Sequence, residues 1–161
     1  MDLKEFFLKQ KQAAYKNSLK VFEAIPPDKL HWRPAEGMLT LGEIVRHVWM
    51  SEEGIRRVAL ENRWDYFEKR VPLGLSGILG KVDSLEHELK RLEQVNQDTI
   101  SSVEDFSLER WEEERKDERF GVRTKVAVML FGINEHQTHH RAQAGVYLHL
   151  ITGTRVSHYA L

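Results

Sequence analysis

Residues that interrupt helices are few and unevenly placed in this chain of 161 residues. The four prolines occupy positions 26, 27, 34 and 72, and three of the ten glycines cluster at 74, 77 and 80. A β-sandwich would instead show turn residues at regular intervals of about 8–12 residues. Because proline removes a helical hydrogen bond and ends most helices, the long stretches without it favour long helices.

Four segments have the apolar periodicity of amphipathic helices. The start of the second is marked by Thr40 and Glu43, which have the spacing of a capping box, and the end of the fourth by Gly153. The sequence therefore predicts an all-α fold, a four-helix bundle. No internal repeat or change of composition marks a second domain, so we predict a single domain over residues 1–161. The predicted helices cover about residues 3–24, 41–59, 82–103 and 124–151.

Polar residues interrupt the apolar stripe of the first segment, which we place along Leu3, Phe7, Gln10 and Ala14. Gln10 and Asn17 are either tolerated at the edge of the core or face a polar cavity. The same stripe geometry makes Tyr147 of the last segment a third candidate for lining a pocket.

Residues 104–123 form a highly charged connection between the last two predicted helices. A run of charges of both signs is typical of a solvated loop or a short hairpin. We expect Trp111 within it to anchor the connection to the bundle.

Composition excludes several classes of protein. The chain has no cysteine, which removes zinc ribbons, cysteine nucleophiles and disulfide frameworks. Its 24 Lys and Arg residues balance 25 Asp and Glu, so there is no basic excess for nucleic acid or anionic membrane. No apolar run approaches the ~20 residues of a membrane helix, and the first five residues do not resemble a signal peptide. We expect a cytoplasmic protein without nucleic acid or membrane partners.

Eight histidines are the main candidates for chemistry. On a helical wheel, His136 and His140 fall inside the apolar face of the last predicted helix. Spacing alone is weak, since about 0.4 such pairs are expected by chance at this composition, but burying two imidazoles costs free energy unless their nitrogens find partners, and a metal ion is one such partner. His47, at the edge of the second helix's core face, is the candidate third ligand.

The alternative is that His47, His136 and His140 are core or boundary histidines that backbone carbonyls and neighbouring side chains satisfy. The other histidines have simpler interpretations. We expect His87 to be solvated, packing to explain His31, and His149 and His158 to lie on the surface or in loops.

Two common helical metal sites do not fit. A ferritin-like di-iron site needs Glu three residues before each histidine, where this chain has Ile133 and Gln137. A zincin protease needs Glu directly after the first histidine, and that position is again Gln137.

Two stretches resemble the DinB/YfiT-like superfamily. Residues 25–53 contain Pro26-Pro27, Leu30-His31-Trp32-Arg33-Pro34, Gly37, Leu39-Thr40-Leu41 and His47 ahead of Glu52. Residues 136–143 read His-Gln-Thr-His-His-Arg-Ala-Gln, similar to the superfamily's last-helix pattern of His, three residues, then His-Arg-Gly-Gln. Ala142 stands where the pattern has Gly, and such a small change should leave a metal site intact.

The resemblance implies an up-down-down-up four-helix bundle that binds one divalent metal through His47, His136 and His140, and it implies a homodimer. Three imidazoles suit zinc, nickel, iron(II) or copper; we expect zinc or nickel first, with iron or manganese as further candidates. The superfamily's name implies no DNA role for a chain this short and neutral.

Members with known activity resemble metal-dependent transferases that use a low-molecular-weight thiol, or hydrolases and isomerases of small molecules. We therefore expect a metal-dependent enzyme with a small-molecule substrate, thiol transfer ranking before hydrolysis. A metal-binding stress-response or binding protein without turnover is one alternative, and a metal-free helical homodimer is another. Glu43, Arg141 and Gln143 are candidate supporting residues, and none is assigned as catalytic.

Overall fold

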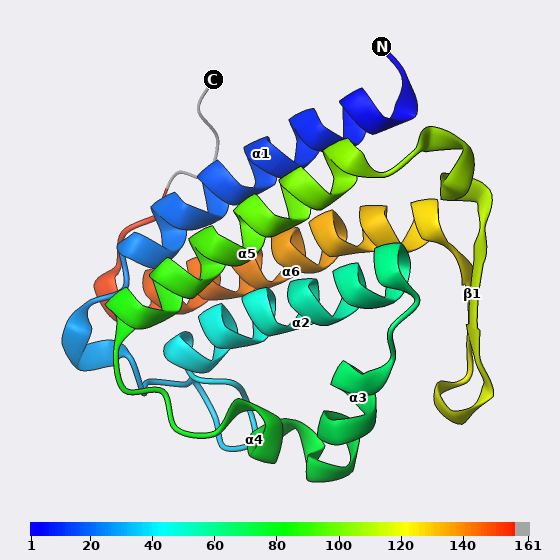
Figure 1. The fold of residues 1–161 in the computed structure, drawn as a ribbon. Helices are drawn as coiled ribbons and strands as arrows, with labels where there is room; N and C mark the ends of the chain where they lie inside the picture. Colours follow the sequence, from blue (N-terminus) through cyan, green and yellow to red (C-terminus); the bar gives the residue numbers. More distant parts are fainter. Residues whose placement is uncertain (157–161) are drawn as a thin grey trace.

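The structure is a computed structural model and describes residues 1–156. Four long helices lie side by side: α1 (Leu3–Glu23), α2 (Leu41–Glu61), α5 (Leu85–Asp105) and α6 (Val126–Thr152). Helices α1 and α6 run in one direction and α2 and α5 in the other (Figure 1). Each of α1 and α2 packs against both α5 and α6, so α1 and α2 occupy diagonal corners. The prediction of an all-α fold is confirmed in part: the described residues are mostly helical, and they also form a small two-stranded sheet.

The connections carry smaller elements that the sequence did not resolve. Between α2 and α5 lie α3 (Asp65–Arg70) and α4 (Gly74–Leu79), joined by a 3₁₀ turn at Val71–Leu73. Neither helix was predicted, because each has only six residues and shows no helical period. Residues 104–123 adopt the hairpin alternative, with β1 (Glu114–Asp117) antiparallel to β2 (Val122–Lys125). Further 3₁₀ turns lie at Pro27–Lys29, Leu108–Glu112 and Glu118–Phe120.

The helix ends follow local chemistry. The Thr40 hydroxyl accepts the Glu43 amide at 3.2 Å, and the Glu43 carboxylate accepts the Thr40 amide at 2.7 Å, which completes the predicted capping box. Helix α5 begins at Leu85 rather than Val82, because the Ser84 side chain caps it by accepting the His87 amide at 3.3 Å. Gly153 ends α6 with φ 70°, as its position predicted.

Over residues 1–156, the core consists of two apolar clusters, each with residues from all four long helices. We call one the capping-box-side cluster and the other the hairpin-side cluster. The capping-box-side cluster contains Val21, Phe22, Ile25, Leu41, Ile44, Val45, Val48, Leu92, Ala144, Tyr147 and Leu148. The hairpin-side cluster contains Phe7, Ala59, Leu60, Val103, Phe106, Trp111, Val126, Leu130 and Ile133.

Between these clusters the long helices carry buried polar residues. We choose one from each helix and call this set the polar layer: Lys11, Glu52, Asn96 and Gln137. The Lys11 ammonium lies 3.0 Å from a Glu52 carboxylate oxygen and donates to the Gln137 amide oxygen at 3.0 Å. Burial lowers the pKa of Lys11, and the attraction of Glu52 opposes that shift. The ion pair therefore joins helices that occupy diagonal corners of the bundle.

The buried face of α1 differs from the predicted stripe. Leu3 and Gln10 are exposed, whereas Lys11 and Ser18 are fully buried. The buried positions 7, 11, 14, 18 and 21 alternate in steps of four and three, which is regular for a bundle helix. The prediction failed because a lysine was not expected at a core position, and it becomes tolerable there only through Glu52 and Gln137.

The hairpin closes one end of the bundle. Trp111 is buried and meets the Phe7 ring edge-on, with centroids 5.8 Å apart, which confirms its predicted role as an anchor. Arg115 is also buried, contrary to the expectation of a solvated connection. Its Nε donates to the carbonyls of Val58 and Ala59 at 3.1 and 2.9 Å, so it satisfies carbonyls at the C-terminal end of α2.

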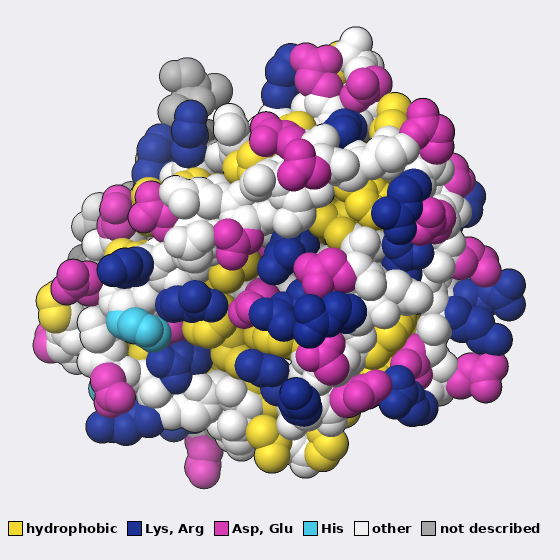
Figure 2. Space-filling view, viewed as in Figure 1, with side chains coloured by type: hydrophobic (Ala, Val, Ile, Leu, Met, Phe, Trp, Pro, Cys, Tyr) yellow, Lys and Arg dark blue, Asp and Glu magenta, His cyan; other side chains and the backbone are white. Residues whose placement is uncertain are grey.

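The surface carries intermixed charges. On the face seen in Figure 2, Lys and Arg side chains alternate with Asp and Glu rather than gathering into a patch of one sign. Within the described part of the chain, no helix is both long enough and apolar enough to cross a membrane.

Candidate metal centre

Helices α2 and α6 pack together and bring three histidines to one place. His47 projects from α2, and His136 and His140 project from successive turns of α6. Their ring centroids lie 4.5–4.8 Å apart. Among the described residues these three form a group whose nitrogen ligand atoms all lie within 4.8 Å of one another. The structure therefore joins the three histidines that the sequence singled out.

The spacing of the nitrogens fits ligands of a single ion. Nε2 of His47 and Nε2 of His136 are 3.1 Å apart. Two imidazoles bound tetrahedrally to zinc at 2.0–2.1 Å place their nitrogens about 3.3 Å from each other. The donor set, three imidazoles from two adjacent helices, could hold a divalent metal ion.

Neighbouring side chains orient the rings. The Nδ1 of His140 lies 2.8 Å from the Gln143 amide oxygen, and the Gln143 amide nitrogen donates to the Tyr147 hydroxyl at 3.0 Å. Since an amide oxygen only accepts, this contact assigns the proton to Nδ1 and leaves Nε2 of His140 free as a ligand. On α2, the Ser51 hydroxyl lies 3.5 Å from Nδ1 of His47, and Nε2 again faces the cluster.

Electrostatics keep the three rings neutral at ordinary pH. Burial and the proximity of His140 lower the pKa of His47 to about 4. Burial, followed by His140 and His47, lowers the pKa of His136 to about 3. Burial also lowers the pKa of His140, although its contact with Gln143 works in the opposite direction. Neutral imidazoles are the form that binds metal.

A second polar network fixes α2 next to this site. Arg46 donates to both carboxylate oxygens of Glu88 on α5, at 2.6 and 3.1 Å, and to the carbonyls of Leu79 and Lys81. Burial raises the pKa of Glu88, but the hydrogen bonds from Arg46, Trp49 and His87 together lower it below its ordinary value. The residue preceding His47 is therefore held by two other parts of the chain.

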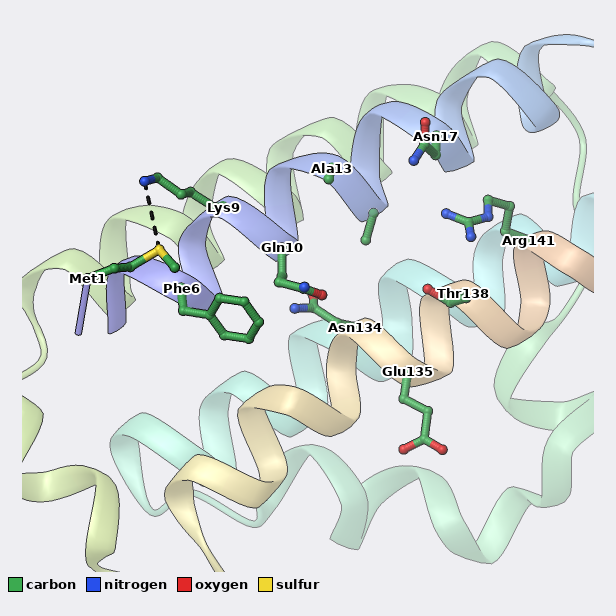
Figure 3. A pocket seen from close by; sticks show the side chains of 11 residues that line it. Met1, Phe6, Lys9, Gln10, Ala13, Asn17, Asn134, Glu135, Thr138 and Arg141 are labelled. Atoms are coloured by element: carbon green, nitrogen blue, oxygen red, sulfur yellow. Dashed lines mark hydrogen bonds between the residues drawn. The ribbon is translucent and has the colours of Figure 1, made fainter. Parts of the chain in front are cut away.

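Other residues that the sequence suggested for the site cap a helix or line a separate groove in this arrangement. Glu43 is engaged in the capping box, and Arg141 is buried on the α1 side of α6. Gln10 and Asn17 line a groove between α1 and α6 together with Asn134 and Thr138 (Figure 3). Residues 134 and 138 are each two positions from His136, about 200° around the helix, so this groove opens on the opposite side of α6.

Tyr147 lies in the core and supports Gln143 rather than lining that groove. Among the other histidines, His87 and His149 are exposed, in line with their interpretation. His31 is also exposed, so packing does not explain it; the adjacent Trp32 packs instead, edge-on to Tyr147. His158 lies outside the described residues.

Sequence reasoning missed the full extent of the supporting row on α6. His136, His140, Gln143 and Tyr147 follow steps of four, three and four, the spacing of one helix face. A polar row on an otherwise apolar face is the signal that would have identified Gln143 and Tyr147 as a linked pair.

Comparison with known proteins agrees with this arrangement. The sequence profile of the DinB superfamily matches residues 10–144, a range that includes all three histidines. The chain belongs to the DinB superfamily. Among solved structures, this DinB superfamily chain is similar to a DinB-like protein, YjoA, from Bacillus subtilis, with a TM-score of 0.74 and 18% identity over 94% of each chain. At that identity the likeness shows a shared fold. No curated protein sequence matches the chain.

Proposed function

We propose that this DinB superfamily protein binds one divalent metal ion through His47, His136 and His140. We further propose that it is a metal-dependent enzyme acting on a small molecule. The observation that carries the proposal is the convergence of three neutral imidazoles, with two Nε2 atoms 3.1 Å apart. Zinc or nickel is the first expectation, with iron or manganese next.

The ligand set favours a catalytic rather than a purely structural role. Three neutral ligands leave the charge of the ion uncompensated and leave coordination positions for water or substrate. When bound, such an ion lowers the pKa of a water or holds a substrate thiolate or carboxylate as a Lewis acid. We rank transfer of a low-molecular-weight thiol ahead of hydrolysis. Gln143 keeps His140 in the required tautomer, and Ser51 supports His47.

The experiment is elemental analysis of untagged protein purified without chelators, beside His47→Ala and His136→Ala. We expect close to one divalent metal per chain in the parent, and loss of the metal in both variants with retained helicity. His139→Ala is the matched control, since His139 is an exposed neighbour of His140 outside the three-histidine group. A metal-free parent that takes up neither zinc nor nickel would overturn the proposal.

A second candidate is a metal-binding protein without turnover. It is favoured by the capping box, because the Glu43 carboxylate is engaged there. Glu43 is therefore not available to support the three histidines. This alternative predicts that chelation lowers the melting temperature while no small thiol or ester substrate is consumed.

Three further expectations, on helix topology, oligomeric state and cellular location, complete the proposal. The helix directions in Figure 1 support an up-down-down-up bundle of the DinB/YfiT type. Exposed Val146 and Leu150 on α6 offer apolar surface for a second copy, so we propose a homodimer, which light scattering of the purified protein checks. The balanced charge supports a cytoplasmic protein without nucleic acid or membrane partners, and cell fractionation tests the location.

A further inference from the structure

A small pocket opens beside His47, between α2 and the segment of α3, the following turn and α4. Its volume is about 160 Å³, and His47 belongs both to this pocket and to the histidine cluster. Met50 and Ser51 complete the α2 side, while Val71, Leu75 and Ile78 are among the side chains that the segment contributes. The segment therefore forms a wall next to the candidate metal centre.

Both ends of this wall are fixed to the rest of the protein. At the C-terminal end of the wall, the Arg46 side chain donates to the carbonyls of Leu79 and Lys81 at 2.7 and 2.6 Å. At the N-terminal end of the wall, Trp64 stacks on Phe120 of the hairpin turn, with ring centroids 5.9 Å apart, and Glu68 forms an ion pair with Arg119. The pocket is thus a preformed feature of the fold rather than a gap between loose loops.

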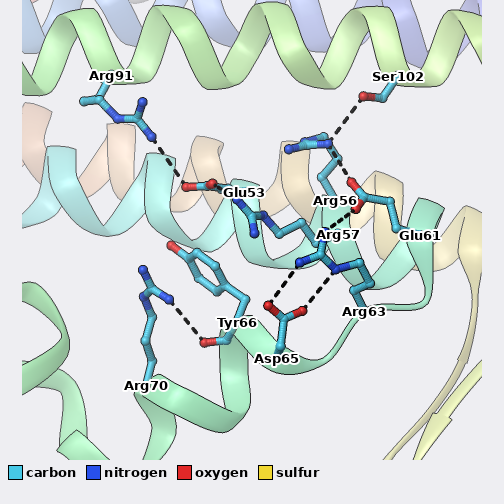
Figure 4. Close-up of polar contacts among 10 residues, drawn as sticks. All are labelled: Glu53, Arg56, Arg57, Glu61, Arg63, Asp65, Tyr66, Arg70, Arg91 and Ser102. Atoms are coloured by element: carbon cyan, nitrogen blue, oxygen red, sulfur yellow. Dashed lines mark hydrogen bonds and ion pairs between the residues drawn. The ribbon is translucent and has the colours of Figure 1, made fainter.

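Helix α3 lies directly against α2 at Gly54, where an added Cβ would come within 2.8 Å of the Tyr66 ring. Figure 4 shows Tyr66 beneath α2 with Arg70 beside it. The Arg70 guanidinium lies 3.7 Å from the centroid of the Tyr66 ring, which is cation–π distance. Arg70, the one cation among the described residues that line the pocket, is therefore already engaged with an aromatic face.

The lining determines what the pocket accepts. None of its described lining residues carries a carboxylate, and most are apolar, so an uncharged apolar group fits it best. Sites for whole drug-sized ligands measure about 300–1,000 Å³. A volume of 160 Å³ corresponds to about five water volumes, enough for a short alkyl chain or a single ring.

We propose that this pocket selects the substrate of the metal centre by taking an uncharged alkyl or single-ring group, while the substrate's polar group lies at the His47 end. The inference rests on the proposed function, because it needs a metal ion at the three histidines. Leu75 and Val71 act as positioning residues for the apolar group and do not touch the reacting atoms.

The test measures binding of straight-chain alkyl hydroxamates, from two to eight carbons, to zinc-loaded protein by calorimetry. The hydroxamate serves as a metal-binding head and the chain as the probe of the pocket. We expect affinity to rise by up to about fourfold per methylene and to level off once the pocket is filled, at about five carbons. Leu75→Asp should abolish this rise of affinity with chain length, while its zinc content stays that of the parent.

Leu73→Asp is the matched control, because Leu73 belongs to the same segment and is exposed but does not line the pocket. It should keep the full dependence on chain length. If the two-carbon probe binds but affinity does not rise with length, or if Leu75→Asp keeps the rise, the pocket assignment is wrong and the metal centre stands. If the protein takes up no zinc, or the two-carbon probe fails to bind the loaded protein, the proposed function fails and the pocket assignment with it.

Discussion

At the scale of single residues, the candidate site depends on side chains that touch no ion themselves. Gln143 links the His140 ring to the Tyr147 hydroxyl, and this contact decides which ring nitrogen is available. Partners of this kind fix the tautomer and the orientation of a metal-binding imidazole. Two predictions belong to this scale.

Gln143→Leu should weaken zinc binding by about 10–100-fold, because His140 loses the acceptor that fixes its tautomer and ring orientation. The measurement is competition with a chromophoric chelator. Gln97→Leu on the exposed face of α5 is the control and should bind zinc like the parent. Equal affinity in Gln143→Leu would show that the ring is oriented by packing alone.

Metal-free protein should lose stability as the pH falls from about 6.5 toward 4. His47 and His136 have pKa values of about 4 and about 3 in the folded chain, against 6.5 for the free residue. Within this window the unfolded chain binds more protons, so the free energy of unfolding decreases with decreasing pH. Urea unfolding in the presence of a chelator at pH 7, 6 and 5 measures the slope.

The double variant His47→Gln, His136→Gln isolates the contribution of the two rings, since carboxylates titrate in both proteins alike. Its slope between pH 7 and 5 should be clearly shallower than that of the parent. Parallel slopes would mean that the two imidazoles do not resist protonation in the fold.

At the scale of elements, the long helices were predictable and the connection from α2 to α5 was not. The capping box at Thr40 and the stop at Gly153 are local signals, and each is read from a few neighbouring residues. Helices α3 and α4 are only six residues each, too short to show a period. Their position depends on contacts with Gly54, Arg46 and the hairpin, which no local pattern contains.

Gly54→Ala should destabilise the protein by about 1–3 kcal/mol, because the new methyl would lie 2.8 Å from the Tyr66 ring and 2.9 Å from the Phe67 ring. Gly132→Ala in α6 is the matched control. An added Cβ at Gly132 meets nothing within 4 Å, so that variant should instead gain about 0.5–1 kcal/mol from helix propensity. Urea unfolding of both variants checks the opposite signs.

At the scale of the whole molecule, the polar layer divides the core into two apolar clusters. The sequence pattern placed Gln10 rather than Lys11 on the stripe of the first helix, and neither Lys11 nor Glu52 was recognised as a core residue. A buried charge is tolerable only opposite its partner, and that partner is 41 positions away in the sequence on a diagonal helix. The histidine site could be predicted better, because two of its candidate ligands share one helix face and form a spacing motif.

Lys11→Met should cost about 3–5 kcal/mol of unfolding free energy, because it leaves the Glu52 carboxylate buried without its cation. Adding Glu52→Met should recover most of that loss, since an apolar pair of similar volume replaces the ion pair. Lys9→Met is the control, because Lys9 is a surface residue whose ammonium contacts Glu5 on the same helix and Met1 just before that helix. A double variant as unstable as Lys11→Met would contradict this account of the layer.

The division of the core also orders events during synthesis of the chain. Both clusters draw on all four long helices, so neither can close before part of α6 has been made. The hairpin-side cluster is complete once Ile133 is available, whereas the capping-box-side cluster waits for Leu148. His136 and His140 are added between these two points. The nascent chain therefore acquires its last two candidate ligands after one half of the core can form and before the other half can.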